Sequence, residues 1–180
     1  MAKKIAIAVL VLIVGFLVLV ALQPREFRIT RNAEMSASPA AVFAQVNDLH
    51  KWEAWSPWIK LDPAAKNTYE GSAAGTGAIF RWAGNNDVGE GSMTITESRP
   101  NELIQFKLDF LKPMASTCLS EFSFKAEGDK TRVSWSMTGQ NNFIAKAMCL
   151  FMNMDKMVGG SFEQGLATLK KIVESPASKP

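Results

Sequence analysis

The C-terminal part of the chain carries one long apolar stripe that needs a large apolar partner surface. From Ile144 to Val173 the apolar residues recur with a period near 3.6, which is typical of a helix with one buried face. Gly159 and Gly160 interrupt the middle of this stripe, so we expect the helix to bend or split there. A single helix cannot cover its own apolar face, and the rest of the chain must therefore supply the surface on which it packs.

Residues 66–139 predict a sheet that supplies this surface. Short runs of alternating apolar and polar residues are separated by turns rich in glycine, asparagine and aspartate. Alternation predicts strands with one buried face, and consecutive strands with short turns predict an antiparallel meander. The expected strands are residues 67–71, 78–83, 90–98, 102–111, 116–125 and 131–139.

A strand and two short helices are expected before this meander. Residues 27–37 alternate, although Arg31 falls among the apolar positions of that strand. Ser38 followed by Pro39 predicts a helix start, because serine caps helix N-termini and proline suits the first turn. That helix should end near Leu49, and a tryptophan-rich helix or turn follows. The order of elements predicts an α+β domain in which a curved antiparallel sheet wraps around the long C-terminal helix.

The first 25 residues predict a membrane anchor. Residues 5–22 contain no charged or polar side chain, and as a helix of 18 residues they would rise about 27 Å, close to the thickness of a bilayer core. This run is longer than the apolar region of a cleaved signal peptide, which is the alternative. Lys3 and Lys4 favour a cytoplasmic N-terminus, although three arginines after the run oppose it. We expect a single-pass protein of a bacterial inner membrane, with residues 26–175 as one domain facing the periplasm or cell exterior and 176–180 as a polar tail; a cytoplasmic domain is the other possibility.

Composition excludes several functional classes. Without Lys3 and Lys4 the chain has 18 basic and 17 acidic residues, which is poor evidence for nucleic-acid binding. One histidine and two cysteines exclude most metal sites and any disulfide-rich scaffold. We therefore expect no metal and no cofactor.

Three segments resemble one known family. Residues 38–43 and 52–58 are similar to the opening of bacterial polyketide cyclase/dehydrase-like proteins, a branch of the START-like (SRPBCC) superfamily. Residues 75–85 resemble the second and third strands of these proteins, and 151–166 resemble their final helix. The likeness covers roughly residues 26–174 and implies the helix-grip fold, preceded here by one transmembrane helix.

The resemblance implies an apolar cavity between the sheet and the last helix, and binding of a hydrophobic small molecule or lipid. The family offers no shared catalytic motif, so binding without chemistry is the first hypothesis. The alternatives are a cyclase-, dehydratase- or hydrolase-type enzyme that uses the same cavity, and an interaction domain whose cavity is vestigial. The candidate lining residues are the inward positions of the strands and helix, namely Phe80, Trp82, Met93, Ile95, Phe106, Leu108, Phe110, Phe122, Trp135, Met137, Met148, Phe151 and Met152.

Two aromatic or methionine-rich segments need a partner. Trp52, Trp55 and Trp58 are interpreted first as a plug that packs the short helices on the sheet, and otherwise as a cavity mouth or a membrane contact. Four of the nine methionines fall between Met148 and Met157, where apolar residues occupy nearly every side of the helix. That extra surface must meet the tryptophan segment, a ligand or the bilayer.

No catalytic constellation is recognisable. His50 is expected to be a solvated residue at a helix end. Glu97 and Glu121 would act as general bases only if buried. The strand parity of Glu97 points inward, but its place at a strand end favours a solvated glutamate. Cys118 and Cys149 are expected to be free thiols, with a disulfide as the minority alternative.

Overall fold

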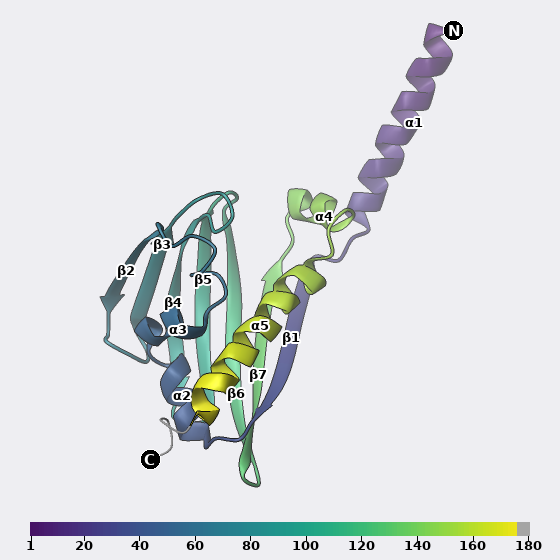
Figure 1. Ribbon diagram of the computed structural model, residues 1–180. Helices are drawn as coiled ribbons and strands as arrows, with labels where there is room; N and C mark the ends of the chain where they lie inside the picture. The colour runs from purple at the N-terminus through teal and green to yellow at the C-terminus, as the bar shows by residue number, and fades with distance from the viewer. Residues whose placement is uncertain (176–180) are drawn as a thin grey trace.

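The computed structural model describes residues 1–175, so the predicted polar tail at 176–180 lies outside the described residues. Helix α1 (Ala2–Ala21) projects away from a domain in which helices lie on one side of a curved sheet (Figure 1). Among the described residues, α1 alone has the length and hydropathy needed to cross a membrane. A signal sequence has the same properties, and both interpretations fit this helix.

Seven antiparallel strands form one sheet, which confirms the meander. The spatial order β1-β7-β6-β5-β4-β3-β2 follows the chain, except that the first strand pairs with the last. The strands are β1 (Glu26–Met35), β2 (Lys66–Gly71), β3 (Ala78–Ala83), β4 (Glu90–Arg99), β5 (Leu103–Lys112), β6 (Ser116–Glu127) and β7 (Lys130–Gln140).

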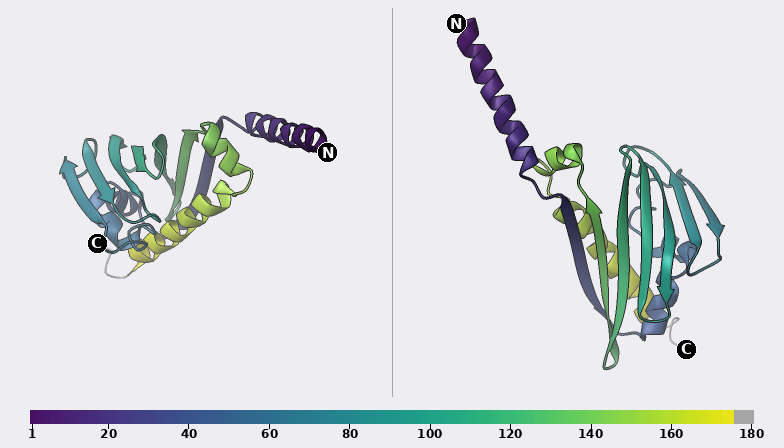
Figure 2. Two further views of the ribbon diagram at one scale, coloured as in Figure 1. Left: turned by 90° about the horizontal axis from the view of Figure 1, so that it is seen from above. Right: turned by 180° about the vertical axis from the view of Figure 1, so that it is seen from behind.

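The helices occupy the inner side of the sheet. Viewed from above, the sheet curls around α2 (Pro39–Val46) and α3 (Trp52–Trp55) (Figure 2). In the view of Figure 1, the long helix α5 (Met154–Glu174) crosses in front of β1 and β7. A short 3-10 helix, η1 (Leu49–Lys51), joins α2 to α3. This arrangement confirms the α+β helix-grip fold.

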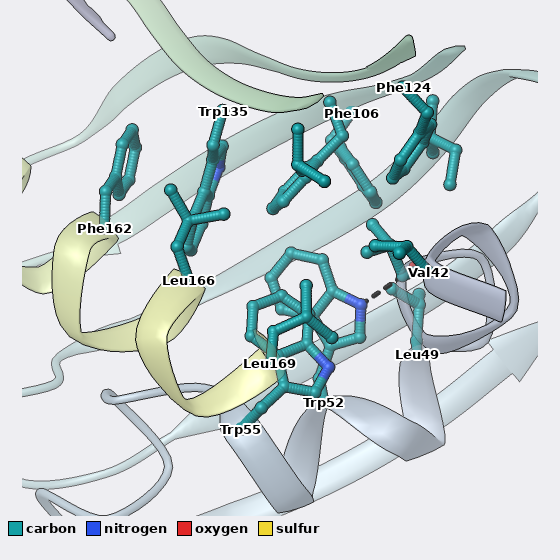
Figure 3. Packing of buried hydrophobic residues seen from close by; sticks show 14 of the residues in the cluster. Val42, Leu49, Trp52, Trp55, Phe106, Phe124, Trp135, Phe162, Leu166 and Leu169 are labelled. Carbon is teal, nitrogen blue, oxygen red and sulfur yellow. Dashed lines mark hydrogen bonds between the residues drawn. The ribbon is translucent and has the colours of Figure 1, made fainter. Parts of the chain in front are cut away.

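The predicted start of α2 is confirmed by its cap. The Ser38 hydroxyl accepts a hydrogen bond from the backbone N–H of Ala41, and Pro39 occupies the first turn. The helix ends at Val46, three residues earlier than expected, and the carbonyl of Val46 accepts a hydrogen bond from Trp52 Nε1 at 2.9 Å. This bond ties the tryptophan-rich segment to the end of α2, and Figure 3 shows Trp52 and Trp55 beside that helix.

The helix does not split at Gly159 and Gly160, and the break in the chain comes earlier. Helix α4 (Phe143–Cys149) ends before residue 150, and α5 begins after Asn153, whose side chain accepts a hydrogen bond from the N–H of Lys156 at 2.9 Å. Helix α5 then runs through both glycines without interruption. Gly159 serves close packing, because a Cβ atom there would overlap the guanidinium group of Arg31.

Arg31, the charged residue in an otherwise apolar strand face, links β1 to α5. Its guanidinium donates to Glu163 at 2.6 Å and to Asp155 at 2.9 Å. These contacts raise the pKa of Arg31 above its ordinary value and lower the pKa of Asp155. The arginine therefore faces the helix as an ion-pairing group on the inner surface of the sheet.

Candidate ligand-binding site

The strand register arranges the inner face of the sheet in rows, because residues directly opposite each other on paired strands share a face. One row contains Phe122 and Trp135, on the half of the sheet away from α1. Another contains Phe27, the second residue of β1, and runs through Gly139, Cys118, Leu108 and Met93 to Phe80. Along the strand direction, the inner face thus has a half remote from α1 and a half at the level of the end of α1, called here the half beside α1.

The half remote from α1 is filled with protein. Trp135 is stacked between two rings, with centroid distances of 4.0 Å to Phe162 and 4.6 Å to Phe122. Trp52 meets Phe106 edge-on at 5.4 Å, as Figure 3 shows from close by. Five of the predicted lining residues are buried here as ordinary core: Ile95, Phe106, Phe122, Trp135 and Met137. Met93 is buried as well, although it lies in the row of Phe27, between Leu108 and Phe80.

The half beside α1 is covered incompletely. Four predicted lining residues are only half-buried there, although their partners in the register place them on the inner face: Phe80, Trp82, Leu108 and Phe110. The Trp82 ring lies 5.9 Å from Phe80 and 5.8 Å from Phe110, and its Nε1 donates to the carbonyl of Val88. These four residues, called here the open aromatic face, form the candidate site.

A glycine makes room for the central ring of the open aromatic face. A Cβ atom on Gly91, the register partner of both Trp82 and Phe110, would lie 2.6 Å from Trp82 Cζ2. The indole therefore lies flat across β4. Phe27 was not among the predicted lining residues, yet its ring lies in the same way over Gly139, where a Cβ would lie 2.7 Å from it.

The tryptophan segment is divided between core and border. Trp52 and Trp55 are 6% and 1% exposed, which fits the plug and leaves neither ring any surface to offer a bilayer or a cavity mouth. Trp58 is half-buried, with its ring edge-on to Trp135 at 5.7 Å and to Phe162 at 6.1 Å. Trp58 marks the border of the filled half.

The three predicted lining residues nearest the start of the last helix lie outside the domain core. Phe151 is 79% exposed, and Met148 and Met152 are exposed as well. The reason is the helix break after Cys149, which turns α4 away from the sheet so that its apolar face does not continue that of α5. Phe151 and Met152 instead line a surface groove of about 650 Å³ between the end of α1, the start of β1 and the α4–α5 turn.

The carboxylates considered as general bases are not buried. Glu97 is 45% exposed and pairs with Arg99 at 3.1 Å, as expected for a solvated glutamate. A bulge between Ile95 and Glu97 breaks the parity that had pointed this side chain inward. Glu121 accepts a hydrogen bond from Gln105 at 3.0 Å.

The lone histidine and the lone tyrosine line a second, smaller depression of about 230 Å³. The His50 ring stacks on Tyr69 with centroids 4.0 Å apart, and Tyr69 donates to Glu53 at 2.8 Å. Burial and the bond to Glu53 raise the pKa of Tyr69 above its ordinary value. His50 is exposed, as expected, and sequence analysis missed its stacking partner because Tyr69 lies on β2, across a long loop.

Neither cysteine forms a disulfide in the part of the chain that the structure describes. Cys118 and Cys149 are free thiols, and burial raises the pKa of Cys118. Within residues 1–175 the structure brings together no group of three or more His, Cys, Asp or Glu side chains suited to a metal ion.

A sheet that grips one long helix, with an apolar inner face left half-covered, defines a protein of the helix-grip class. The chain belongs to the polyketide cyclase / dehydrase and lipid transport family, whose model matches residues 26–174. This family has a fold suited to hydrophobic ligands. No curated protein matches the chain.

Solved structures show the same fold at low sequence identity. Protein CV1439 from Chromobacterium violaceum is 16% identical, with a TM-score of 0.59 over 84% of this chain and 99% of that one. The Aha1 dimer protein from Colwellia psychrerythraea is also 16% identical, with a TM-score of 0.56 over 86% and 99%. The di-domain ARO/CYC StfQ from the steffimycin biosynthetic pathway is 10% identical, with a TM-score of 0.61 over 86% of this chain and 53% of that one.

Proposed function

We propose that the protein binds a hydrophobic small molecule or lipid on the open aromatic face, while α1 holds it in a membrane. The supporting observation is the half-burial of Phe80, Trp82, Leu108 and Phe110 on a face whose other half is solid core. Apolar side chains on an inward face are normally covered, and an adaptable aromatic surface suits an apolar ligand.

The site lies at the end of the strands from which α1 projects, although on the other side of the sheet from α1. Phe27 shares its row with Leu108 and Phe80, and β1 begins at Glu26, close behind the end of α1 at Ala21. The open aromatic face lies on β3 and β5, across the sheet from β1, so a ligand that leaves the bilayer beside α1 would have to pass over β7 and β6 to reach it. The filled half, closed by Trp135 and Phe162, limits the ligand to the half beside α1.

Native mass spectrometry of the full-length protein, extracted in detergent, tests this site. Leu108→Trp places a larger ring on the open aromatic face and should remove a co-purifying lipid-sized adduct. Leu119→Trp is the matched control, because Leu119 is 58% exposed and lies one register step away on the outer face. Lipids that merely surround α1 would survive in both variants, whereas a site ligand would be lost from Leu108→Trp alone. An adduct retained equally by both variants, with unchanged melting curves, would contradict the proposed site.

We further propose that residues 1–25 anchor the protein in a bacterial inner membrane and that the domain of residues 26–175 faces the periplasm or cell exterior. Lys3 and Lys4 before the apolar run support this orientation. A reporter that is active only in the periplasm, fused after Pro180, should give signal. Signal from a reporter active only in the cytoplasm would reverse the orientation, and recovery of soluble protein beginning near Leu22 would exclude the anchor.

A further inference from the structure

We propose that α4 and the α4–α5 turn, residues 143–152, insert into the boundary between head groups and acyl chains of the bilayer that α1 crosses. This inference rests on the proposed anchoring by α1. It adds a second membrane contact, made by a segment far from the anchor in sequence. The segment is called here the membrane-facing segment.

The first observation is a concentration of exposed apolar side chains. Beyond Leu22, nine large hydrophobic residues of the described chain are exposed, and six of them fall between residues 143 and 157. Phe143 is 53% exposed, Ile144 58% and Phe151 79%. Single exposed apolar residues are common on soluble proteins, but a contiguous group marks a surface that meets an apolar partner.

The second observation fixes the partner, because this surface is continuous with α1. The Phe151 ring lies 6.4 Å from Phe16 of α1, centroid to centroid. The Lys146 ammonium donates to the carbonyl of Ala21, the last residue of α1, at 3.3 Å. Figure 1 shows α4 beside the base of α1, on the domain side.

The position of Phe16 gives the depth of the segment. Phe16 precedes Ala21 by five residues, which corresponds to about 7–8 Å along the helix axis. Since the apolar run ends at Leu22, a side chain at the level of Phe16 lies below the head groups of the leaflet next to the domain. Helices that lie in the membrane interface bury their apolar faces by roughly 5–10 Å, and the contact between Phe151 and Phe16 matches this depth.

The charges of the segment fit the same placement. Lys146 is the one charged residue of 143–152, and its side chain is 8% exposed because it turns toward the C-terminal end of α1. A cation at that end meets the negative pole of the helix dipole, so its charge does not point into the apolar surface. Arg25 and Arg28, both exposed, follow α1 directly, at the level expected for lipid phosphates.

Depth measurements on the full chain in nanodiscs of phosphatidylcholine and phosphatidylglycerol test the inference. In a Cys149→Ser background, nitroxide labels are attached separately to Phe16→Cys, Phe151→Cys and Leu119→Cys, since native Cys118 is buried. Power saturation then compares collisions with oxygen, which enters the bilayer, and with a water-soluble nickel complex. Near-ultraviolet circular dichroism verifies that each labelled variant is folded.

We expect the label at position 151 to resemble the label at 16, with an oxygen-to-nickel ratio several-fold above that at 119. A buried label at 16 with a nickel-accessible label at 151 would overturn the second contact, leave the anchor intact, and make the exposed surface a contact for another protein. Nickel access at all three positions would overturn both this inference and the proposed anchoring.

Discussion

The indole of Trp135 on β7 lies flat against the phenyl ring of Phe162 on α5, with centroids 4.0 Å apart and planes inclined by 8°. Trp135 Nε1 also donates to the hydroxyl of Ser120 at 3.0 Å, so the polar edge of the ring is satisfied inside the core. A Cβ at Gly165, one turn further along α5, would lie 3.0 Å from the same indole. These contacts hold α5 against the sheet at the point where a cavity was expected.

The two phenylalanines of the last helical region should respond differently to truncation. Phe162→Ala should lower the free energy of unfolding by about 3–5 kcal/mol, because it leaves a void beside Trp135. Phe151→Ala should change it by less than about 0.5 kcal/mol, since the side chain is 79% exposed. Denaturant titrations in detergent measure both values. Similar losses for the two variants would contradict the assignment of Phe162 to the core and Phe151 to the surface.

Alanine substitutions at the two adjacent glycines of α5 should have opposite effects on the stability of the protein. Gly160→Ala meets no atom within 4 Å and should stabilise the protein by up to about 1 kcal/mol, because alanine is the better helix former. Gly159→Ala places its methyl group against the Arg31 guanidinium and should lower the melting temperature below that of the wild type. A higher melting temperature in both variants would contradict this prediction, and would show that Arg31 moves aside without losing its carboxylate partners.

Tyr69 is the only tyrosine of the chain, so ultraviolet absorbance of tyrosinate reports on it alone. Burial and the hydrogen bond to Glu53 raise its pKa, so ionisation in the folded protein should begin well above pH 10. The raised pKa stabilises the fold below about pH 10, and this stability is lost as the pH rises above that value. Glu53→Gln should shift the titration back toward pH 10. An identical titration in folded and denaturant-unfolded protein would contradict this prediction.

The ion pairs of Arg31 should affect how the melting temperature of the protein falls in acid. The hydrogen bond from Arg31 lowers the pKa of Asp155, so this carboxylate stabilises the fold above the ordinary carboxyl pKa of about 3.9. That contribution is lost as the pH falls through and below this value. Arg31→Gln should therefore reduce the fall in melting temperature between about pH 5 and pH 3. Parallel acid profiles for the variant and the wild type would show that Asp155 gains nothing from Arg31.

Local patterns predicted most of the fold. The alternation of β5 and the Ser38 cap each depend on neighbours within a few residues, and both were confirmed. The sequence showed Arg31 only as a charged residue among the apolar positions of its strand. Its ion pairs could not be predicted, because Asp155 and Glu163 lie more than 120 residues further along the chain.

The break between α4 and α5 was missed for a different reason. Two glycines gave a stronger local signal than Asn153, although asparagine is a preferred N-cap and accepts from Lys156 here. What distinguishes Gly159 is the guanidinium beside it, which belongs to another strand. The alternation of β4 also predicted the wrong face for Glu97. A single bulge between Ile95 and Glu97 reverses the face on which the following side chains lie, and the alternation pattern does not show it.

The candidate site was predicted as a set of inward residues, and burial then divided that set. Register alone cannot tell Phe106 from Phe110, because both point to the same side of β5. Phe106 is covered by Trp52, whereas Phe110 meets the half-buried Trp82. That distinction depends on where α3 and α5 lie over the sheet.

The place of β1 in the sheet determines when the domain can be completed. β1 pairs with β7 alone, Glu26 opposite Gln140 and Met35 opposite Thr131, so its partner is synthesised about a hundred residues later. At translation rates of about 5–20 residues per second, the strand that follows α1 waits roughly 5–20 s for its neighbour. The carboxylates that pair with Arg31 emerge later still. During biosynthesis, α1 is therefore complete long before the sheet edge to which it is joined can form.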